Sequence, residues 1–285
     1  MVLFFAACSD EQSNGRVKIY LTDAPVDGSQ VDALFLSITK IELKGSSGWT
    51  TLKEFSTPLS IDILDYQNGN SFFVTEETLK ADTYTEVRLI VQAAEAGSSP
   101  QTNPGCFLQM KDGTRKELFV PSGGQSGYKV KGAFTLPPDG TVAVTLDFDA
   151  RKSVVATGNG RYLLKPTVRL IANQDAALIE GKFAEHSAYA KTVVYAYAKG
   201  TFDINEAETP ASGETRFSNA ITSTALDASG NFKLAFLEPG DYELVFAAHA
   251  ADGEFVDVIG KYENATVTSG ARLQLALSLS LLIRL

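Results

Sequence analysis

Hydrophobic and polar residues alternate with a period of two along most of the chain after Gly15. Such alternation is typical of β-strands, because successive side chains then point to opposite faces of a sheet. The alternating runs are separated by turn sequences such as Gly45-Ser-Ser-Gly48 and Pro137-Pro-Asp-Gly140. No amphipathic helix of three turns is visible, although Thr75–Lys80 could form one helical turn. The sequence therefore predicts an all-β protein and excludes an α/β fold.

The runs form two successive sets, which meet near Ile171–Ala177. The first set of expected strands is Val17–Thr22, Ala33–Leu43, Thr85–Gln92, Cys106–Met110, Glu117–Val120, Tyr128–Leu136, Thr141–Phe148 and Tyr162–Ile171. The second set is Leu178–Phe183, Thr192–Ala198, Arg216–Leu226, Asn231–Leu237, Tyr242–Ala248, Phe255–Ile259, Ala265–Val267 and Ala271–Leu281. A polar stretch, Thr201–Gly213, interrupts the second set and is expected to be a mobile loop.

The distribution of charge also divides the chain. Residues 175–285 carry 8 Lys and Arg against 15 Asp and Glu, a net charge of -7 out of -9 for the whole chain. At 285 residues the chain is long enough for two domains. We expect two β-sandwich domains in tandem, of immunoglobulin-like or transthyretin-like type, at residues 16–173 and 176–285.

The N-terminus resembles the end of a lipoprotein signal peptide. The apolar run Val2–Ala7 precedes Cys8, and the block Phe5-Ala6-Ala7-Cys8 is similar to the lipobox of bacterial lipoproteins. A polar tether follows, and its Ser9-Asp10-Glu11 resembles the surface-export signal of Bacteroidetes lipoproteins. Residues 1–15 are therefore expected to be a truncated signal and tether, with Cys8 lipidated. The alternative is an irregular N-terminal strand with a buried cysteine. The remaining cysteine, Cys106, is expected in the core.

Each expected domain resembles a known family. The first carries Val17–Pro25, Tyr84–Leu89, Leu146–Ala150 and Leu164–Leu170 in the order seen in domain of unknown function family 4382. This resemblance implies a secreted, lipid-anchored β-sandwich, and it does not point to any particular activity. The second carries Asp227–Leu234 and Leu237–Leu244, and resembles carboxypeptidase regulatory-like modules, relatives of transthyretin and starch-binding folds. Modules of that kind are mostly structural, and some bind sugars.

Composition and motifs argue against several classes of function. An acidic chain repels phosphate backbones, which argues against nucleic-acid partners. The chain lacks a nucleophile elbow, a P-loop, a zinc-protease motif and an EF-hand loop. Its two histidines, His186 and His249, lie on separate elements and are expected to be solvated. We therefore predict that the protein is not an enzyme and needs no cofactor or metal.

Paired carboxylates are the main alternative to that prediction. Asp147 and Asp149 share one side of a strand, and Asp62 and Asp65 lie close in sequence. With Asp23 and Asp27 they could bind Ca²⁺ or act as a glycosidase pair. We favour the interpretation that these residues accept backbone hydrogen bonds at strand ends.

Four aromatic residues are candidates for contact with a ligand. Trp49 follows the Gly45–Gly48 turn, and Tyr66, Phe72 and Phe73 flank a second turn. Because alternating strands give one face to the core and one to solvent, ligand contacts are expected on such loops. The same rings could instead plug the end of the core, and for Trp49 we favour that alternative.

The sequence thus predicts a non-enzymatic lipoprotein that is lipid-anchored in the outer membrane and faces either the cell surface or the periplasm. Its expected role is adhesion, ligand capture or surface assembly, with a membrane anchor on Cys8 and a glycan or surface protein as partner. The alternatives are a carbohydrate-binding accessory protein and a subunit of lipoprotein-derived fimbriae.

Overall fold

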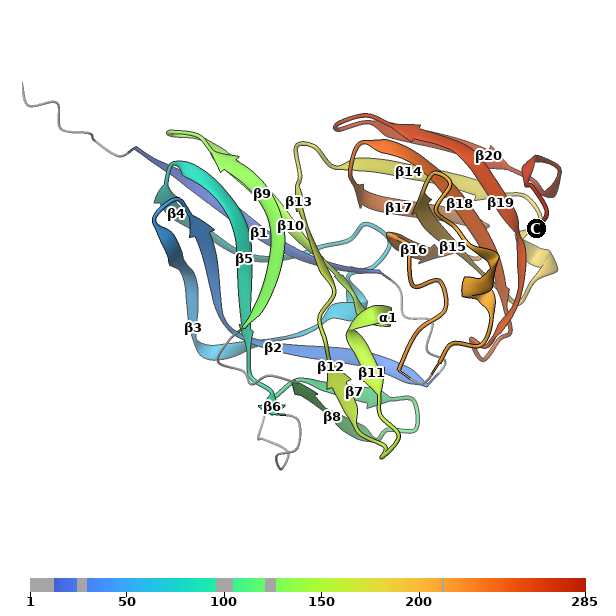
Figure 1. The fold of residues 1–285 in the computed structure, drawn as a ribbon, viewed down its shortest axis with the longest axis horizontal. Coiled ribbons are helices and arrows are strands. Elements are labelled where there is room, and N and C mark those ends of the chain that lie inside the picture. The colour runs from blue at the N-terminus through green and yellow to red at the C-terminus, as the bar shows by residue number, and fades with distance from the viewer. Residues whose placement is uncertain (1–12, 25–29, 96–104, 121–126, 212) are drawn as a thin grey trace, which may run out of the picture.

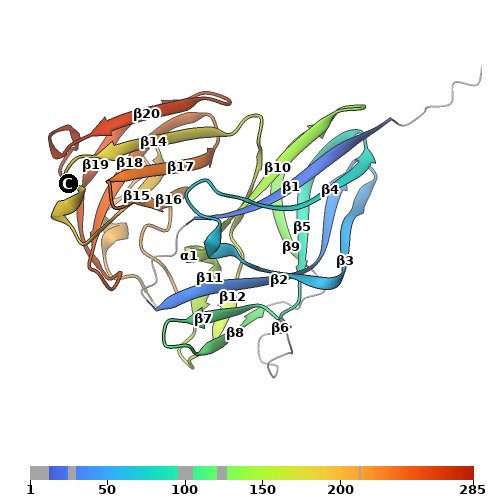
Figure 2. The same cartoon turned by 180° about the vertical axis from the view of Figure 1, so that it is seen from behind.

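The computed structural model describes residues 13–24, 30–95, 105–120, 127–211 and 213–285. Most of these residues lie in β-strands and very few in helices, which confirms the predicted all-β fold (Figures 1 and 2). The short helices of the described part are α1 (Ala150–Ser153), η1 (Ile63–Asp65), η2 (His186–Ala188), η3 (Ile204–Ala207) and η4 (Leu279–Leu281). Among the described residues no helix is long and apolar enough to cross a membrane.

One sheet of the N-terminal half is built on a central parallel pair of strands. Its order is β13-β10-β1-β4, with β1 (Asn14–Ala24), β4 (Phe72–Lys80), β10 (Thr141–Asp149) and β13 (Val168–Ala172). In the parallel pair, Ile19 lies opposite Val144 and Leu21 opposite Leu146. All four of these side chains are fully buried, so the alternating residues of β1 and β10 supply one wall of the core.

The second sheet of this half is organised by the long strand β2 (Val31–Gly45). Its order is β11-β12-β8-β7-β2-β5-β9, with β3 added to β2 and β6 to β8. The other strands are β3 (Gly48–Asp62), β5 (Asp82–Val91), β6 (Ala94–Glu95), β7 (Phe107–Met110), β8 (Arg115–Val120), β9 (Tyr128–Leu136), β11 (Val154–Ala156) and β12 (Tyr162–Leu164). β2 pairs with β7 near its start and with β3 and β5 further along.

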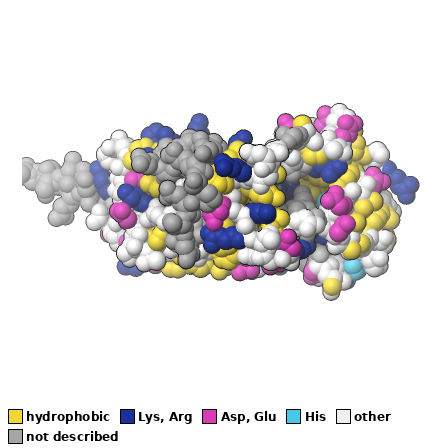
Figure 3. Space-filling model, turned by 90° about the horizontal axis from the view of Figure 1, so that it is seen from below, with side chains coloured by type: hydrophobic (Ala, Val, Ile, Leu, Met, Phe, Trp, Pro, Cys, Tyr) yellow, Lys and Arg dark blue, Asp and Glu magenta, His cyan; other side chains and the backbone are white. Residues whose placement is uncertain are grey.

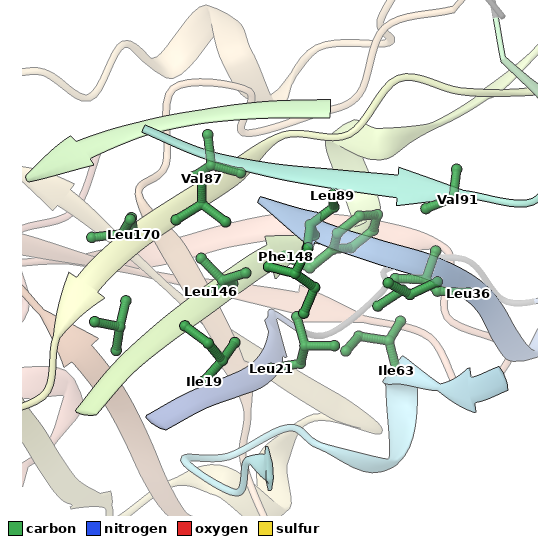
Figure 4. Packing of buried hydrophobic residues seen from close by; sticks show 14 of the residues in the cluster. Ile19, Leu21, Leu36, Ile63, Val87, Leu89, Val91, Leu146, Phe148 and Leu170 are labelled. Carbon is green, nitrogen blue, oxygen red and sulfur yellow. The ribbon is translucent and has the colours of Figure 1, made fainter. Parts of the chain in front are cut away.

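The two sheets enclose one hydrophobic core. Figure 4 shows Leu21 and Phe148 from the first sheet packed towards Leu36 and Leu89 from the second. The sheets also approach each other at their edges. Lys53 on β3 donates to Glu77 on β4 at 2.7 Å, and β9 lies so close to β13 that a Cβ on Gly132 would meet Leu170 at 2.8 Å. The N-terminal half is therefore a sandwich whose edges nearly close.

The C-terminal half is a second sandwich. A sheet of order β17-β14-β20 faces a sheet of order β16-β15-β18-β19. The strands are β14 (Ala177–Phe183), β15 (Lys191–Ala198), β16 (Thr222–Ala225), β17 (Asn231–Leu237), β18 (Gly240–His249), β19 (Phe255–Val267) and β20 (Arg272–Leu277). Phe246 lies between the sheets, with ring centroids 5.1 Å from Phe183 and 5.8 Å from Phe232.

The outer face of the second of these sheets is also buried, against our expectation of one core face and one solvent face per strand. Residues 199–211 and 213–221, which we call the covering segment, lie over β15 and β18. Its Phe217 stacks on Tyr195 at 4.1 Å between centroids, and Glu243 accepts the backbone N–H of Phe202 at 2.7 Å. Phe217 takes a left-handed φ of 54°, a strained geometry that this fully buried stack offsets. Within the expected loop Thr201–Gly213, Phe202 is tied to Glu243 and η3 forms, while most of the described residues are exposed; that this loop is mobile stays a prediction.

Other local expectations were also wrong. Thr75–Lys80 forms no helical turn but most of β4, because the neighbouring β1 satisfies its backbone hydrogen bonds. β3 was not predicted, since Leu52 and Ile61 alone among its residues are deeply buried and its alternation is weak. The final strand ends at Leu277 and is followed by η4, and Arg216–Leu226 forms a strand only at Thr222–Ala225.

Candidate functional site

The predicted ligand loop at Tyr66–Phe73 lies against the C-terminal half. The Thr224 hydroxyl donates to the Asn68 side-chain oxygen at 2.5 Å. Gly69 adopts a φ of 79°, and a Cβ there would meet Lys233 at 2.7 Å. Glycine at this position thus allows both the turn and the close approach. The tip of this loop forms a contact between the two halves of the molecule and is not a free ligand-binding loop.

The four candidate aromatic residues do not converge on one site. Tyr66 and Phe72 contact each other edge-to-face at 5.2 Å and pack on the core. Phe73 lies on β4 beside Tyr20 and is 49% exposed. Trp49, at the start of β3, is half-buried under the Arg88 guanidinium, which lies 4.0 Å from the ring centroid. Trp49 is absent from the described core clusters, so the interpretation of this residue as a core plug was wrong.

The carboxylates near the boundary between the halves are held by hydrogen bonds and ion pairs. Arg151 binds Asp149 through two nitrogens, at 3.2 and 2.9 Å, and Arg169 pairs with Asp147. Although burial opposes ionisation, Arg151 and Lys152 hold the pKa of Asp149 below its ordinary value. Burial raises the pKa of Asp147 despite Arg169.

Asp23 accepts the backbone N–H of Ala150 at 3.0 Å, and its pKa is raised well above the ordinary value, mainly by burial. Asp62 accepts the N–H groups of Leu34 and Leu64, and burial raises its pKa. Asp65 is exposed, and Asp27 lies outside the described residues. No group of three His, Cys, Asp or Glu residues suited to a metal ion occurs in the described ranges. These contacts fit the structural interpretation of the carboxylates.

The histidines and the second cysteine occupy structural positions. His249 is buried and not solvated as expected; its Nδ1 lies 3.1 Å from the Gly253 oxygen, and its Nε2 lies 3.4 Å from the Tyr195 hydroxyl. His186 is partly buried in η2, beside Phe183. Cys106 is a buried free thiol, as predicted, and burial raises its pKa to about 12. Cys8 lies outside the described residues.

A cleft of about 560 Å³ opens where the two halves meet. The apolar lining residues of the N-terminal half that reach the surface are Val31 and, on β11, Val154, Val155 and Ala156, whereas Leu34 and Leu108 also line the cleft but are almost fully buried. Figure 3 views the molecule from below and shows apolar side chains exposed near the middle of this face. Cavities of ~300–1,000 Å³ with mostly apolar walls are the usual size for small-molecule sites.

The opposite wall of this cleft belongs to the covering segment. It presents the side chains of Glu214, Thr215 and Ser218, for which the described residues supply no hydrogen-bond partner. The helix α1 closes the cleft between the walls. There Lys152 donates to the Ala220 oxygen at 2.6 Å, and Arg151 lies 5.3 Å from the centre of the Tyr195 ring. The cleft therefore has one apolar wall and one polar wall, joined by a charged contact.

A larger but more polar groove, of about 840 Å³, runs along the sheet of β14, β17 and β20. Its lining includes Glu180, Lys182, Lys233 and Gln274. Asn68 of the predicted Tyr66–Phe73 loop lines this groove, but no other lining residue of either cavity was predicted as a site, because their members lie far apart in the chain. The one sequence signal was the apolar pair Val154–Val155, which we did not assign to a strand.

Solved structures give only weak overlays on this chain. The Bacillus anthracis TIE protein is 9% identical with a TM-score of 0.22, and the match covers 93% of this chain and 34% of that one. BcpA, the major pilin subunit of Bacillus cereus, is 9% identical with a TM-score of 0.22, and the match covers 93% of this chain and 69% of that one. Shaft pilin SpaA from Lactobacillus rhamnosus GG is 12% identical with a TM-score of 0.22, and the match covers 93% of this chain and 97% of that one. The chain spans about a third of the TIE protein, and TM-scores of this size support no inference about function.

Sequence comparison is more informative for the N-terminal half. No curated protein matches the chain. The family model described as "Domain of unknown function (DUF4382)" matches residues 14–166, which is more than half of the 285 residues. The matched range runs from β1 through β12 and includes the apolar wall of the cleft. The expected resemblance is confirmed, and the chain belongs to the DUF4382 family.

Proposed function

We propose that this protein is a non-enzymatic, lipid-anchored protein of the outer membrane or cell surface that captures a small, largely apolar ligand. The observation that carries the proposal is the cleft between the two halves, with its accessible apolar lining of Val31 and of Val154, Val155 and Ala156 on β11. Burying apolar ligand surface there would contribute ~25 cal/mol per Å². The charged side chains beside it, Arg151 and Lys152, are engaged with Asp149, which supports binding rather than catalysis.

The test is binding of a neutral apolar probe, N-phenyl-1-naphthylamine, by the full chain. Its fluorescence should rise on binding, and Ala156→Trp should abolish the rise by filling the mouth of the cleft. Ala156 is exposed, so this variant should keep its melting temperature. The matched control is Ala276→Trp, which fills the polar groove from an equally exposed position on β20. Loss of probe binding in the control variant alone would place the site in the groove and overturn the proposal.

The anchor is tested separately, in cells with an intact signal sequence. Cys8→Ser should move the protein from the membrane fraction to the soluble fraction, because a diacylated cysteine supplies the second acyl chain that stable anchoring needs. Cys106→Ser is the control, since that thiol is buried and should not affect fractionation. Unchanged membrane association of Cys8→Ser would contradict lipidation at this residue.

A second candidate function, glycan binding, is favoured by the exposed ring of Phe73 beside Tyr20. Aromatic rings on an outer sheet face can stack on sugars, whereas Trp49 already has a face covered by Arg88. On a glycan array, Phe73→Ala should remove any binding and Trp49→Ala should retain it. The reverse result would restore Trp49 as the platform, and no binding by the parent chain would eliminate this candidate.

A further inference from the structure

The cleft between the two halves runs along a free edge of a β-sheet. β11 is the last strand of its sheet and pairs on one side only, with β12. Figure 1 shows β12 on one side of β11 and the covering segment on the other. All three residues of β11, Val154, Val155 and Ala156, line the cleft, although successive side chains of a strand point to opposite faces. The cleft therefore follows the edge of the strand and not one of its faces.

The hydrogen bonds around β11 show which of its backbone groups point away from β12. Thr157 donates its N–H to the Arg161 oxygen at 2.8 Å across the hairpin. Bonding to the neighbour alternates along an antiparallel strand, so Val154 and Ala156 direct their backbone groups to the other side. The Val154 N–H is bonded to the Ala150 oxygen at the end of α1. No described residue bonds to the Val154 oxygen or to the N–H and oxygen of Ala156, so these three groups are free to pair with a ligand.

Sheet edges are usually protected, because their unpaired groups can bind another strand. The opposite end of this sheet, β9, lies against β13, where Gly132 approaches Leu170. β11 has no such cover among the described strands. It carries no charged residue and no proline, and its pairing with β12 has no register shift. β11 is therefore an open edge, limited only by its length of three residues.

We propose that the cleft takes an extended peptide, which adds to β11 as a further strand of the sheet. This inference rests on the proposed capture function and names the chemical class of the ligand. The peptide backbone exchanges hydrogen bonds with Ala156 and donates one to the Val154 oxygen. In strand addition of this kind, main-chain bonds supply affinity and alternate side chains supply specificity.

The walls of the cleft suit the two faces of such a strand. Val31 and Val155 offer apolar surface on the N-terminal side, and the covering segment offers Glu214, Thr215 and Ser218 opposite. Because an added strand sends successive side chains to opposite faces, a peptide of alternating apolar and small polar residues matches both walls. The volume of about 560 Å³ and the short β11 restrict the bound part to a few residues.

The first test uses the full chain and a fluorescein-labelled pentapeptide of alternating threonine and valine, blocked at both ends. Fluorescence anisotropy should show binding. Methylating the backbone nitrogens of the second and fourth residues leaves one edge of the peptide intact, and this peptide should still bind. Methylating all five nitrogens should weaken binding about tenfold or more, because neither edge can then donate to β11. Capture of apolar surface alone predicts the opposite order, since each methyl group adds apolar area.

The second test changes β11 itself. Ala156→Pro removes the outward N–H and leaves the pairing with β12 intact, because edge strands tolerate a proline whose nitrogen faces away from the neighbour. It should weaken pentapeptide binding about tenfold or more and retain binding of N-phenyl-1-naphthylamine. The matched control is Ala276→Pro on β20, an equally exposed edge position. Its N–H also points away from the neighbouring strand, because the adjacent Leu277 bonds to Ala184, and this variant should bind the peptide as the parent does.

The outcomes separate this inference from the function on which it rests. Binding of N-phenyl-1-naphthylamine without binding of the pentapeptide would overturn strand addition and leave apolar capture standing. Unweakened binding of the fully methylated peptide, or unchanged peptide affinity in Ala156→Pro, would do the same. If Ala156→Pro lowers the melting temperature, the methylated peptides decide the question on the parent chain. Failure of the parent chain to bind either ligand would overturn the capture function and this inference together.

Discussion

The boundary between the two halves differs sharply from one place to another. At the Asn68–Gly69 turn the halves touch directly, with a hydrogen bond from Thr224 and Lys233 packed on the glycine. At β11 the apolar side chains of the N-terminal half face a polar wall of the C-terminal half across an open cleft. Direct polar contacts set the position of one half on the other. Where an apolar wall faces a polar wall, the halves do not pack together and the cleft leaves room for a ligand.

The largest effect should come from separating the halves. No residue is shared between the core of the N-terminal half and the clusters of the C-terminal half. We propose that residues 176–285 fold alone, with cooperative unfolding and an enthalpy of roughly 80 kcal/mol near 60 °C. Calorimetry and near-UV circular dichroism would check this. A soluble fragment without a cooperative transition would show that the direct contact is required for folding.

Breaking the charged contact at α1 should have the next largest effect. Asp149→Ala leaves the buried Arg151 guanidinium without its bidentate partner, and should cost ~3–5 kcal/mol in the free energy of unfolding. Asp65→Ala removes an exposed carboxylate and should stay within about 0.5 kcal/mol of the parent. Urea denaturation measures both, and similar losses for the two variants would contradict a special role for this ion pair.

Removing the hydrogen bond at the Asn68–Gly69 turn should lower the free energy of unfolding by a smaller amount. Thr224→Val keeps the shape of the side chain and removes the donor to Asn68, so we expect a loss of ~1 kcal/mol. A double-mutant cycle with Asn68→Ala isolates the pair. A coupling energy near zero would show that the two halves are held together elsewhere.

The smallest expected effect is a gain in stability at Asp23 that is lost at acidic pH. Because burial raises the pKa of Asp23 in the folded state, its ionisation opposes folding as the pH rises above the ordinary value for Asp. Asp23→Asn cannot ionise and still accepts from Ala150, so it should be more stable than the parent at pH 8 and show no gain near pH 3. Melting temperatures across this range test the sign, and a variant less stable than the parent at pH 8 would contradict it.

Prediction from sequence succeeded where burial follows a local period. Tyr128–Leu136 and Asn231–Leu237 were predicted with the bounds that β9 and β17 show. It failed at β3, where few residues are buried, and at Arg216–Leu226, where a strand forms only at Thr222–Ala225 and Phe217 stacks on Tyr195 instead. The sequence identified four aromatic residues as candidate ligand contacts, but the structure does not bring them together in one site. They are Tyr66, Phe72, Phe73 and Trp49.

The all-β class and most strand positions could be read from the chain, and so could family membership, because alternation and local motifs depend on residues close in sequence. Tertiary structure alone decided that the Asn68–Gly69 turn is a contact between halves and that β15 is buried on both faces. It also brought Ala156 and Leu108 opposite Glu214 to make the cleft. Each of these features depends on packing between segments that are distant in sequence. A local sequence pattern does not indicate which surfaces pack together and which stay apart.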